Sequence, residues 1–288
     1  MDSKRIKKLR TEIINTIPKF PNNKETKEIL ESKHLTDLLI VYLNWATRLI
    51  VARPRRVEIE PEVTGDTRWS FISNQFDKLK EKIEKGEDLI PHLSLKAQEK
   101  GFTPAASKTG PGSDKWADKD FLLNVMGFYH FHLGDIQETG KNIVERTDDV
   151  IFAKVDRHTF RAIGVFKHAV FDSVDPVSQE MTSERMRLWQ LFDQIVAKEA
   201  PPGSIVIPSI ITASGHTLHV VRRAKEYVHI IKEIDPKLDN REFVNSLYED
   251  TGIKPPNKPK IEWYLRGTDL GVFDRVANLF VVFRYGSN

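Results

Sequence analysis

The sequence predicts an α+β protein with a helical N-terminal region, a central antiparallel β-meander and a helix-rich C-terminal part with additional strands. Three observations carry this prediction. Apolar residues recur at helical spacing through residues 3–50, they alternate with polar residues in short runs within 120–172, and they form a strand-like run at 279–285. The predicted segments are 1–86 (helical), 87–119 (loop or linker), 120–172 (β core) and 173–288, whose strands join the same sheet or a second one.

The composition is that of a soluble globular protein. The chain has 288 residues, 40% hydrophobic and 30% charged, which suits one large or two ordinary domains. The absence of cysteine excludes disulfides and thiolate metal ligands and favours a cytoplasmic location. No apolar run approaches the roughly 20 residues of a membrane span, so no membrane partner is expected. A net charge of +3 is too small to indicate a polyanionic partner by itself, and the oligomeric state is not predicted.

The N-terminal region carries the periodicity of several amphipathic helices. The spacing predicts helices over 3–17, 24–32 and 70–85, and a more apolar helix that follows His34. Residues 53–56 contain three arginines around a proline, which either grip a phosphate or follow a helix C-terminus, where basic residues are favoured. Residues 87–119 contain several prolines and glycines and predict a loop at a domain boundary.

The central segment holds the candidate site. Side chains alternate along an extended chain, so a strand over 128–133 places Phe128, His130 and His132 on one face and the other three residues on the opposite face. Two further runs, 150–155 and 160–166, predict neighbouring antiparallel strands. Pairing of the three strands would bring a set of basic side chains near the two histidines. This set consists of Arg146, Lys154, His158, Arg161 and His168.

The C-terminal segment alternates helix and strand signals. A helix capped at Thr182 or Ser183 precedes a strand-like run at 204–216, and a strong helix is predicted from Ser214 to Ile234. The start of this helix is either an anion site, because free backbone N–H groups favour anions, or an ordinary helix surface. The residues concerned are His216, His219, Arg222 and Arg223. The last segment predicts a strand, a short helix around Asp269 to Ala277, and a final strand over 279–285.

Part of the central segment resembles a known family. The turn at His132 to Gly134, the following Arg146, the run DDVIFAKV and the run FRAIGVFKH are similar to the core of the small RelE and ParE type toxins. The resemblance covers about 129–171, and the chain is much longer than such toxins. It implies a small antiparallel sheet on helices and metal-free mRNA cleavage by basic and histidine or tyrosine side chains. Over more of its length, the chain resembles larger bacterial proteins with an H-x-H-L-G motif, and that resemblance implies no chemistry.

Three functions remain open from the sequence. The first is a toxin-like or phage-defence endoribonuclease with His130, His132, Arg146 and His168 as catalytic residues. Lys154, His158, Arg161, His216, His219, Arg222 and Arg223 would bind its substrate, without a metal or another cofactor. The second is a non-catalytic module that binds RNA or protein, such as an antitoxin-like partner or a scaffold. The third is a metal-dependent hydrolase with histidine ligands. The expected partners are RNA and an antitoxin or another protein.

Overall fold

The computed structural model describes residues 2–104, 122–136, 143–172, 174, 178–201, 203–204, 211–212 and 216–287. The chain divides into two compact units. Unit 1 comprises Met1–Thr47, Glu99–Pro104 and Leu218–Ser287, and unit 2 comprises the described parts of Arg48–Gln98 and Ala105–Thr217. These units interleave along the chain, whereas the predicted segments 1–86, 87–119, 120–172 and 173–288 are contiguous. The predicted α+β class is confirmed.

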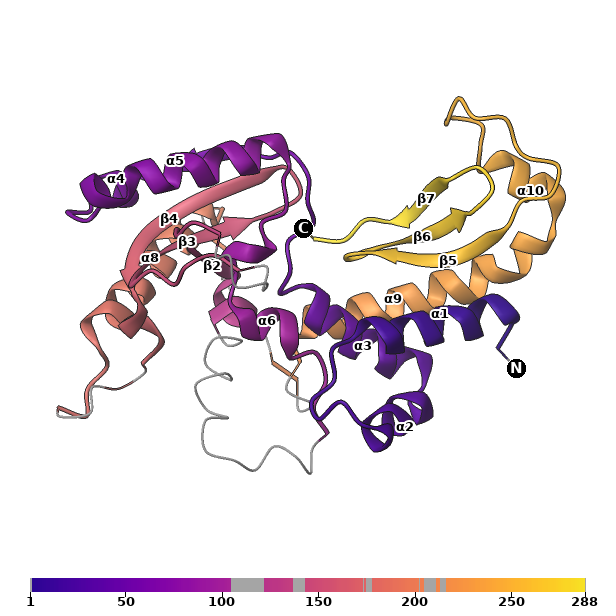
Figure 1. The fold of residues 1–288 in the computed structure, drawn as a ribbon, viewed down its shortest axis with the longest axis horizontal. Coiled ribbons are helices and arrows are strands. Elements are labelled where there is room, and N and C mark those ends of the chain that lie inside the picture. Colours follow the sequence, from indigo (N-terminus) through magenta and orange to yellow (C-terminus); the bar gives the residue numbers. More distant parts are fainter. Residues whose placement is uncertain are drawn as a thin grey trace. The chain divides into compact units, whose positions relative to one another are not determined.

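Unit 1 packs helices on a three-stranded antiparallel sheet of order β5-β6-β7 (Figure 1). Its elements are α1 (Lys4–Thr16), α2 (Lys24–Ser32), α3 (Leu35–Ala46), α9 (Leu218–Ile234), η5 (Asp235–Asp239), α10 (Arg241–Ser246), β5 (Ile261–Arg266), β6 (Asp269–Asp274) and β7 (Leu279–Arg284). Side chains cap two of the helices, because Ser3 accepts from the Ile6 N–H and Asn23 from the Thr26 N–H. The predicted helices at 3–17 and 24–32 are confirmed.

The predicted short helix over Asp269 to Ala277 is wrong, because residues 269–274 form the strand β6. Arg266 pairs with Asp269 across a two-residue turn. Gly267 at the first turn position has φ +57°, a conformation in which a side chain would be strained. The hairpin turn, rather than the local apolar spacing, therefore decides the structure of this segment.

Unit 2 is built on a four-stranded sheet of order β1-β4-β3-β2. Its elements are β1 (Arg56–Ile59), α4 (Pro61–Thr64), α5 (Trp69–Lys85), η1 (Ile90–His92), α6 (Leu95–Glu99), the π-helical turn η3 (Leu122–Met126), β2 (Phe128–His132), β3 (Asp149–Val155), β4 (Thr159–Lys167), η4 (His168–Phe171) and α8 (Ser183–Glu199). β2, β3 and β4 pair as an antiparallel meander, as predicted, and β1 adds a parallel edge strand.

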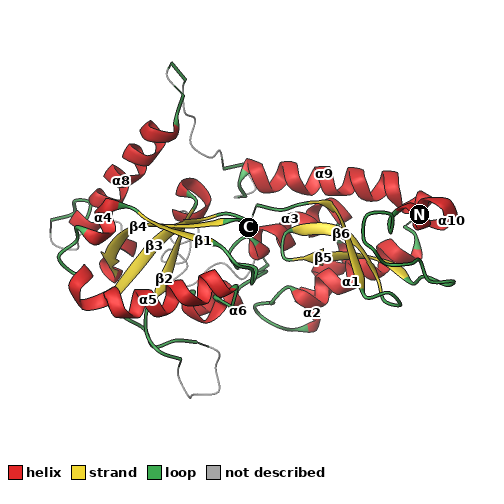
Figure 2. Cartoon of the chain, turned by 90° about the horizontal axis from the view of Figure 1, so that it is seen from above, coloured by secondary structure: helices red, strands yellow, loops and turns green. Residues whose placement is uncertain are grey.

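Both faces of the unit 2 sheet are covered. α5 lies along one face, and α8 packs against the other (Figures 1 and 2). Tyr129, Phe131 and Leu133 enter the core beneath α5, as the alternation predicts. Phe128 enters the second core with Leu188 of α8. The alternation of apolar and polar residues suggests a meander with one buried face, whereas the structure buries both, because the face that carries the histidines also has a hydrophobic core.

The predicted loop at 87–119 contains two helical turns in its described part, η1 and α6. The Asp88 carboxylate accepts from the Ile90 N–H at 2.9 Å, and Leu89, Leu93 and Ala97 are buried. One hydrogen bond from the backbone to a side chain and three buried apolar side chains order this stretch in spite of its proline. Residues 105–119 of the predicted loop lie outside the described residues, as does most of the strand predicted at 204–216.

We expect Phe152→Ala to lower the free energy of unfolding by about 3–5 kcal/mol, because it leaves a cavity in the central strand. The Phe152 side chain is fully buried, with the rings of Phe166 and Phe171 at 5.0 and 5.9 Å. Chemical denaturation followed by near-ultraviolet circular dichroism measures the change. The control is Phe71→Ala, whose side chain is 79% exposed and should shift stability by less than about 0.5 kcal/mol. Equal losses in the two variants would contradict the buried position of Phe152.

Candidate functional site

The ends of three strands bring three histidines together. β2 and β4 both run antiparallel to β3, so the last residues of β2 and β4 lie beside the first residues of β3. His130 and His132 share a face of β2, with ring centroids 6.0 Å apart. His168, the first residue after β4, stacks on His132 at 5.5 Å and 23°. The sequence predicted the first pair by alternation, and the sheet pairing adds the third ring.

Phe171 packs against this group from the 3₁₀ turn η4. Its ring lies 4.6 Å from that of His130 and 5.0 Å from that of His168. His132 is 1% exposed, whereas His130 and His168 are partly exposed. The cluster therefore combines one buried imidazole with two that are partly exposed.

Arg146 completes the cluster. Its Nη1 lies 2.5 Å from His132 Nε2. A guanidinium has donors and no acceptor, so Nε2 of His132 must accept this hydrogen bond and carry no proton. Partial burial lowers the pKa of Arg146, although a guanidinium keeps its charge in water. The contact fixes one nitrogen of Arg146, and among the described residues nothing else bonds to its remaining N–H groups, which can therefore meet a further ligand.

His92 contacts the backbone of β2 where the cluster lies. Its Nδ1 lies 2.8 Å from the backbone oxygen of His132, and its Nε2 lies 3.1 Å from Lys82 Nζ. The ammonium must donate, so His92 accepts at Nε2 and donates from Nδ1–H, and the ring is neutral. Burial lowers the pKa of His92, and the nearby Lys82 charge lowers it further. Sequence reasoning missed this residue, because only a long-range contact gives it a role.

Lys154, His158 and Arg161 do not join the cluster. Lys154 pairs with Phe128, four residues from His132 along β2, which corresponds to about 13 Å. His158 lies between β3 and β4, at the far end of the hairpin. Lys154 contacts Glu199 at 2.6 Å, and Arg161 contacts Glu199 at 2.9 Å. Two further acidic residues lie near Arg161, so these two cations are neutralised within unit 2. The further residues are Glu58, at 2.9 Å, and Glu60, at 3.7 Å.

The anion site predicted at a helix start is described only in part. α9 begins at Leu218, and Ser214 and Gly215 lie outside the described residues. His216 falls in unit 2, and its backbone oxygen accepts from the Thr212 N–H at 2.8 Å. The other three residues, His219, Arg222 and Arg223, belong to α9 in unit 1, where Arg223 contacts Glu226 at 3.5 Å.

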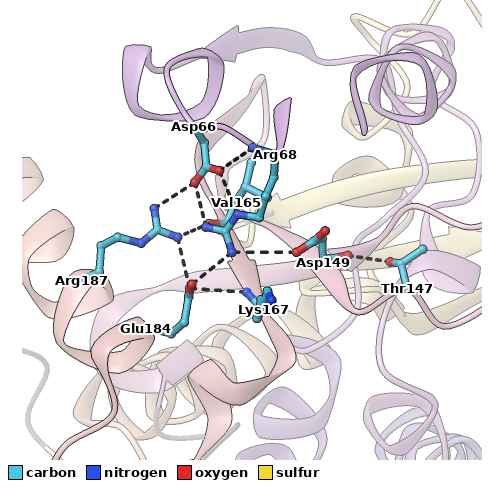
Figure 3. Close-up of polar contacts among 8 residues, drawn as sticks. All are labelled: Asp66, Arg68, Thr147, Asp149, Val165, Lys167, Glu184 and Arg187. Carbon is cyan, nitrogen blue, oxygen red and sulfur yellow. Dashed lines mark hydrogen bonds and ion pairs between the residues drawn. The ribbon is translucent and has the colours of Figure 1, made fainter. Parts of the chain in front are cut away.

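A second charged group adjoins the cluster, and the sequence did not indicate it. Figure 3 shows Arg68 between Asp66, Asp149 and Glu184, with Arg187 on the other side of Asp66 and Glu184. Hydrogen bonds from Arg68 lower the pKa of Asp66. The residues come from segments distant in sequence, so no local motif could reveal them. Asp66, Arg68, Glu184 and Arg187 line a hollow of about 930 Å³.

Thr147 connects this charged group to the end of β2, and Figure 3 shows its contact with Asp149. Its hydroxyl donates to the backbone oxygen of Asp149 at 2.6 Å and accepts from the Leu133 N–H at 3.3 Å. Asp149 in turn lies 3.8 Å from Arg68. The residue that precedes Thr147 is Arg146, so the hydroxyl holds the arginine-bearing segment against the end of β2.

Among the described residues, no group of three or more histidine, aspartate or glutamate side chains is arranged to hold a metal ion. No helix in the described part of the chain is long and apolar enough to cross a bilayer. Comparison of the chain with protein families, with curated proteins and with solved structures finds no match. The resemblance to RelE and ParE type toxins therefore stays a prediction.

The contact with Arg146 predicts the tautomer of His132. We expect nitrogen chemical shifts from a long-range ¹H–¹⁵N spectrum at neutral pH to show a neutral ring with its proton on Nδ1. His229, whose side chain is 80% exposed, provides the reference for a solvent-exposed ring. A ring protonated on Nε2 would contradict the hydrogen bond from Arg146.

His92 predicts a pH dependence of stability. Its folded-state pKa lies below the ordinary value of 6.5, so the unfolded chain takes up a proton first as the pH falls. The stability that comes from the neutral ring is complete above pH 6.5 and is lost as the pH falls toward the folded-state pKa. Urea unfolding at a series of pH values should therefore show a smaller loss in His92→Gln than in the wild type. Parallel curves for the two proteins would argue against a depressed pKa.

Proposed function

We propose that unit 2 is a metal-independent endoribonuclease. The observation that carries the proposal is that one buried imidazole, that of His132, accepts from Arg146 at its edge and stacks on His168 through its face. A guanidinium with uncommitted N–H groups binds a phosphate and stabilises the charge that develops on it. A partly exposed imidazole transfers protons near neutral pH. Both groups lie within reach of a single phosphodiester.

The chemistry assigns separate roles to the cluster. One of the two partly exposed rings, His168 or His130, takes the proton from the ribose 2′-hydroxyl as its oxygen attacks phosphorus. The other ring donates a proton to the departing 5′-oxygen, so that the products are a 2′,3′-cyclic phosphate and a 5′-hydroxyl. Arg146 contacts the phosphoryl oxygens. His132 is a positioning residue, because its Nε2 is already occupied by Arg146.

The toxin or phage-defence setting belongs to this proposal as well. It rests on the resemblance of residues 129–171 to RelE and ParE type cores, together with the meander that carries His132 and Arg146. An antitoxin or another protein would then be the natural partner of the chain, and RNA its substrate. The cytoplasm, where both are found, is the location that we infer.

A second function, non-catalytic binding of RNA or protein, has its own supporting observation. His132 is almost fully buried and packs in a closed aromatic group, as a structural histidine would. Lys154 and Arg161, which were expected to contact RNA, are paired with glutamates. A scaffold tolerates such pairing, whereas a nuclease needs cations that are free to bind phosphate. Arg146 is the residue that favours the nuclease over the scaffold.

The test measures cleavage of a panel of fluorescent single-stranded RNAs by the full chain in the presence of a chelator. We expect cleavage with 2′,3′-cyclic phosphate ends, and a loss of about 10²- to 10⁴-fold in rate for His168→Gln. Arg146→Gln should lose about 10²- to 10³-fold, because it removes the charge that faces the phosphate. RNA with a 2′-deoxy residue at the cleaved position should stay intact, because the attacking oxygen is missing.

The matched control is His229→Gln, which changes an exposed histidine on α9 and should leave the rate unchanged. If the wild type leaves every RNA intact with and without divalent metal, the nuclease proposal is wrong and the binding function takes its place. If cleavage requires added zinc or manganese and the chelator removes it, the histidines act as metal ligands.

A further inference from the structure

The sheet of unit 1 has two unlike faces. Trp263, Leu270 and Val272 point into the core and are at most 1% exposed. The register places Glu262, Tyr264 and Arg266 of β5 on the opposite face, with Phe273 of β6 and Phe280 of β7. The Tyr264 side chain is 38% exposed, and Phe273 and Phe280 are partly exposed. One face thus holds the sheet on its helices, and the other presents aromatic rings to solvent.

The exposed rings form a connected group with a cation beside it. The Tyr264 ring lies 5.7 Å from that of Phe273 and 5.6 Å from that of Phe280. The guanidinium of Arg266 lies over the Phe280 ring at 4.5 Å. In the described part of the chain, Arg266 has no acidic partner. An aromatic surface with an uncompensated arginine at its edge suits a ligand that is both flat and anionic.

This surface borders a hollow of about 830 Å³ between α1 and strands β5 and β6. Two carboxylates, Glu12 and Glu262, line the hollow, and basic residues offset them. Lys8 and Arg275 both contact Glu262, and Arg275 lies 3.7 Å from Glu12. The acidic residues of the hollow are therefore neutralised, and Arg266 gives the hollow a net positive charge.

A basic hollow lies on the other side of α1. It measures about 270 Å³, and its lining includes Lys7, Arg10 and Lys27 with a single acidic residue, Glu31. Asn15 lines both hollows, so the two are neighbours across the C-terminal half of α1. α1 itself carries five basic residues and one acidic residue. The aromatic surface thus continues into a cationic one within the same unit.

We propose that this face of unit 1 binds single-stranded nucleic acid. Bases stack on Tyr264 and Phe273, Arg266 contacts an adjacent phosphate, and the chain continues past Asn15 toward Lys7 and Lys27. Stacking on aromatic rings beside a positive groove is how proteins hold single strands without reading their sequence. The site is separate from the histidine cluster of unit 2, and its argument does not depend on ribonuclease activity.

The test measures binding of the full chain to a fluorescein-labelled 2′-O-methyl oligouridine of about 12 nucleotides by fluorescence anisotropy. This probe cannot be cleaved by attack of a 2′-hydroxyl, so binding and cleavage are measured independently. We expect Tyr264→Ala to weaken binding roughly 5- to 100-fold and Tyr264→Phe to retain it, because stacking needs the ring and not the hydroxyl. Arg266→Glu should weaken binding and reduce its dependence on salt.

Two control variants change the same residue types elsewhere. Phe71→Ala removes an exposed ring on α5, and Lys232→Glu reverses an exposed charge on α9, so both should bind as the wild type does. Single-stranded DNA of the same length should bind, whereas duplex RNA should not, because its bases are already stacked.

Three outcomes would overturn the proposal. In the first, the wild type binds neither single-stranded probe. In the second, Tyr264→Ala and Arg266→Glu bind as tightly as the controls. In the third, these two variants change the sedimentation of the protein alone, which would assign the face to a second copy of the chain. Loss of RNA cleavage in His168→Gln with unchanged oligouridine binding would separate this site from the nuclease.

Discussion

The pairing of β3 with strands on both of its sides is the constraint on which unit 2 depends. β3 is buried on both faces, and its partners β2 and β4 supply the residues that meet beside its first residues. His132, at the end of β2, and His168, just after β4, come together only because both partners run opposite to β3. The same pairing places one core beneath α5 and another against α8. Fold and candidate site are therefore specified by a single set of ladder hydrogen bonds.

Local pattern predicted much of this arrangement. Alternation in 128–133 gave the strand and the shared face of His130 and His132, and apolar spacing gave α1, α2 and α5. The strand β6 was missed because its own residues resemble a short helix, and only the turn at Gly267 and the neighbouring strands settle it. Periodicity reports which face of an element is apolar, and it does not report which element covers that face.

In the candidate site too, local pattern predicted some residues, and contacts between distant segments determine the others. Arg146 was found from its position between two strands, whereas His92 and Arg68 were not found, because their roles come from contacts across long stretches of chain. The sequence also placed both Arg146 and Arg161 near the two histidines. In the structure, Arg161 lies against three glutamates and Arg146 lies against an imidazole. The difference decides which of the two is available to an anion, and it depends entirely on the neighbours that folding supplies.

The interleaving of the two units has a consequence for the order of assembly during synthesis. Arg5 of α1 donates to Asp235, a residue 230 positions further along, and Tyr42 of α3 donates to the backbone oxygen of Gly267. α1 and α3 therefore lack these partners until the whole of unit 2 has emerged from the ribosome. Unit 2 has all of its strands much earlier and can close first. In a nascent chain, the faces of α1 and α3 that pack on β5 and α9 stay uncovered until residues 218–287 have been made.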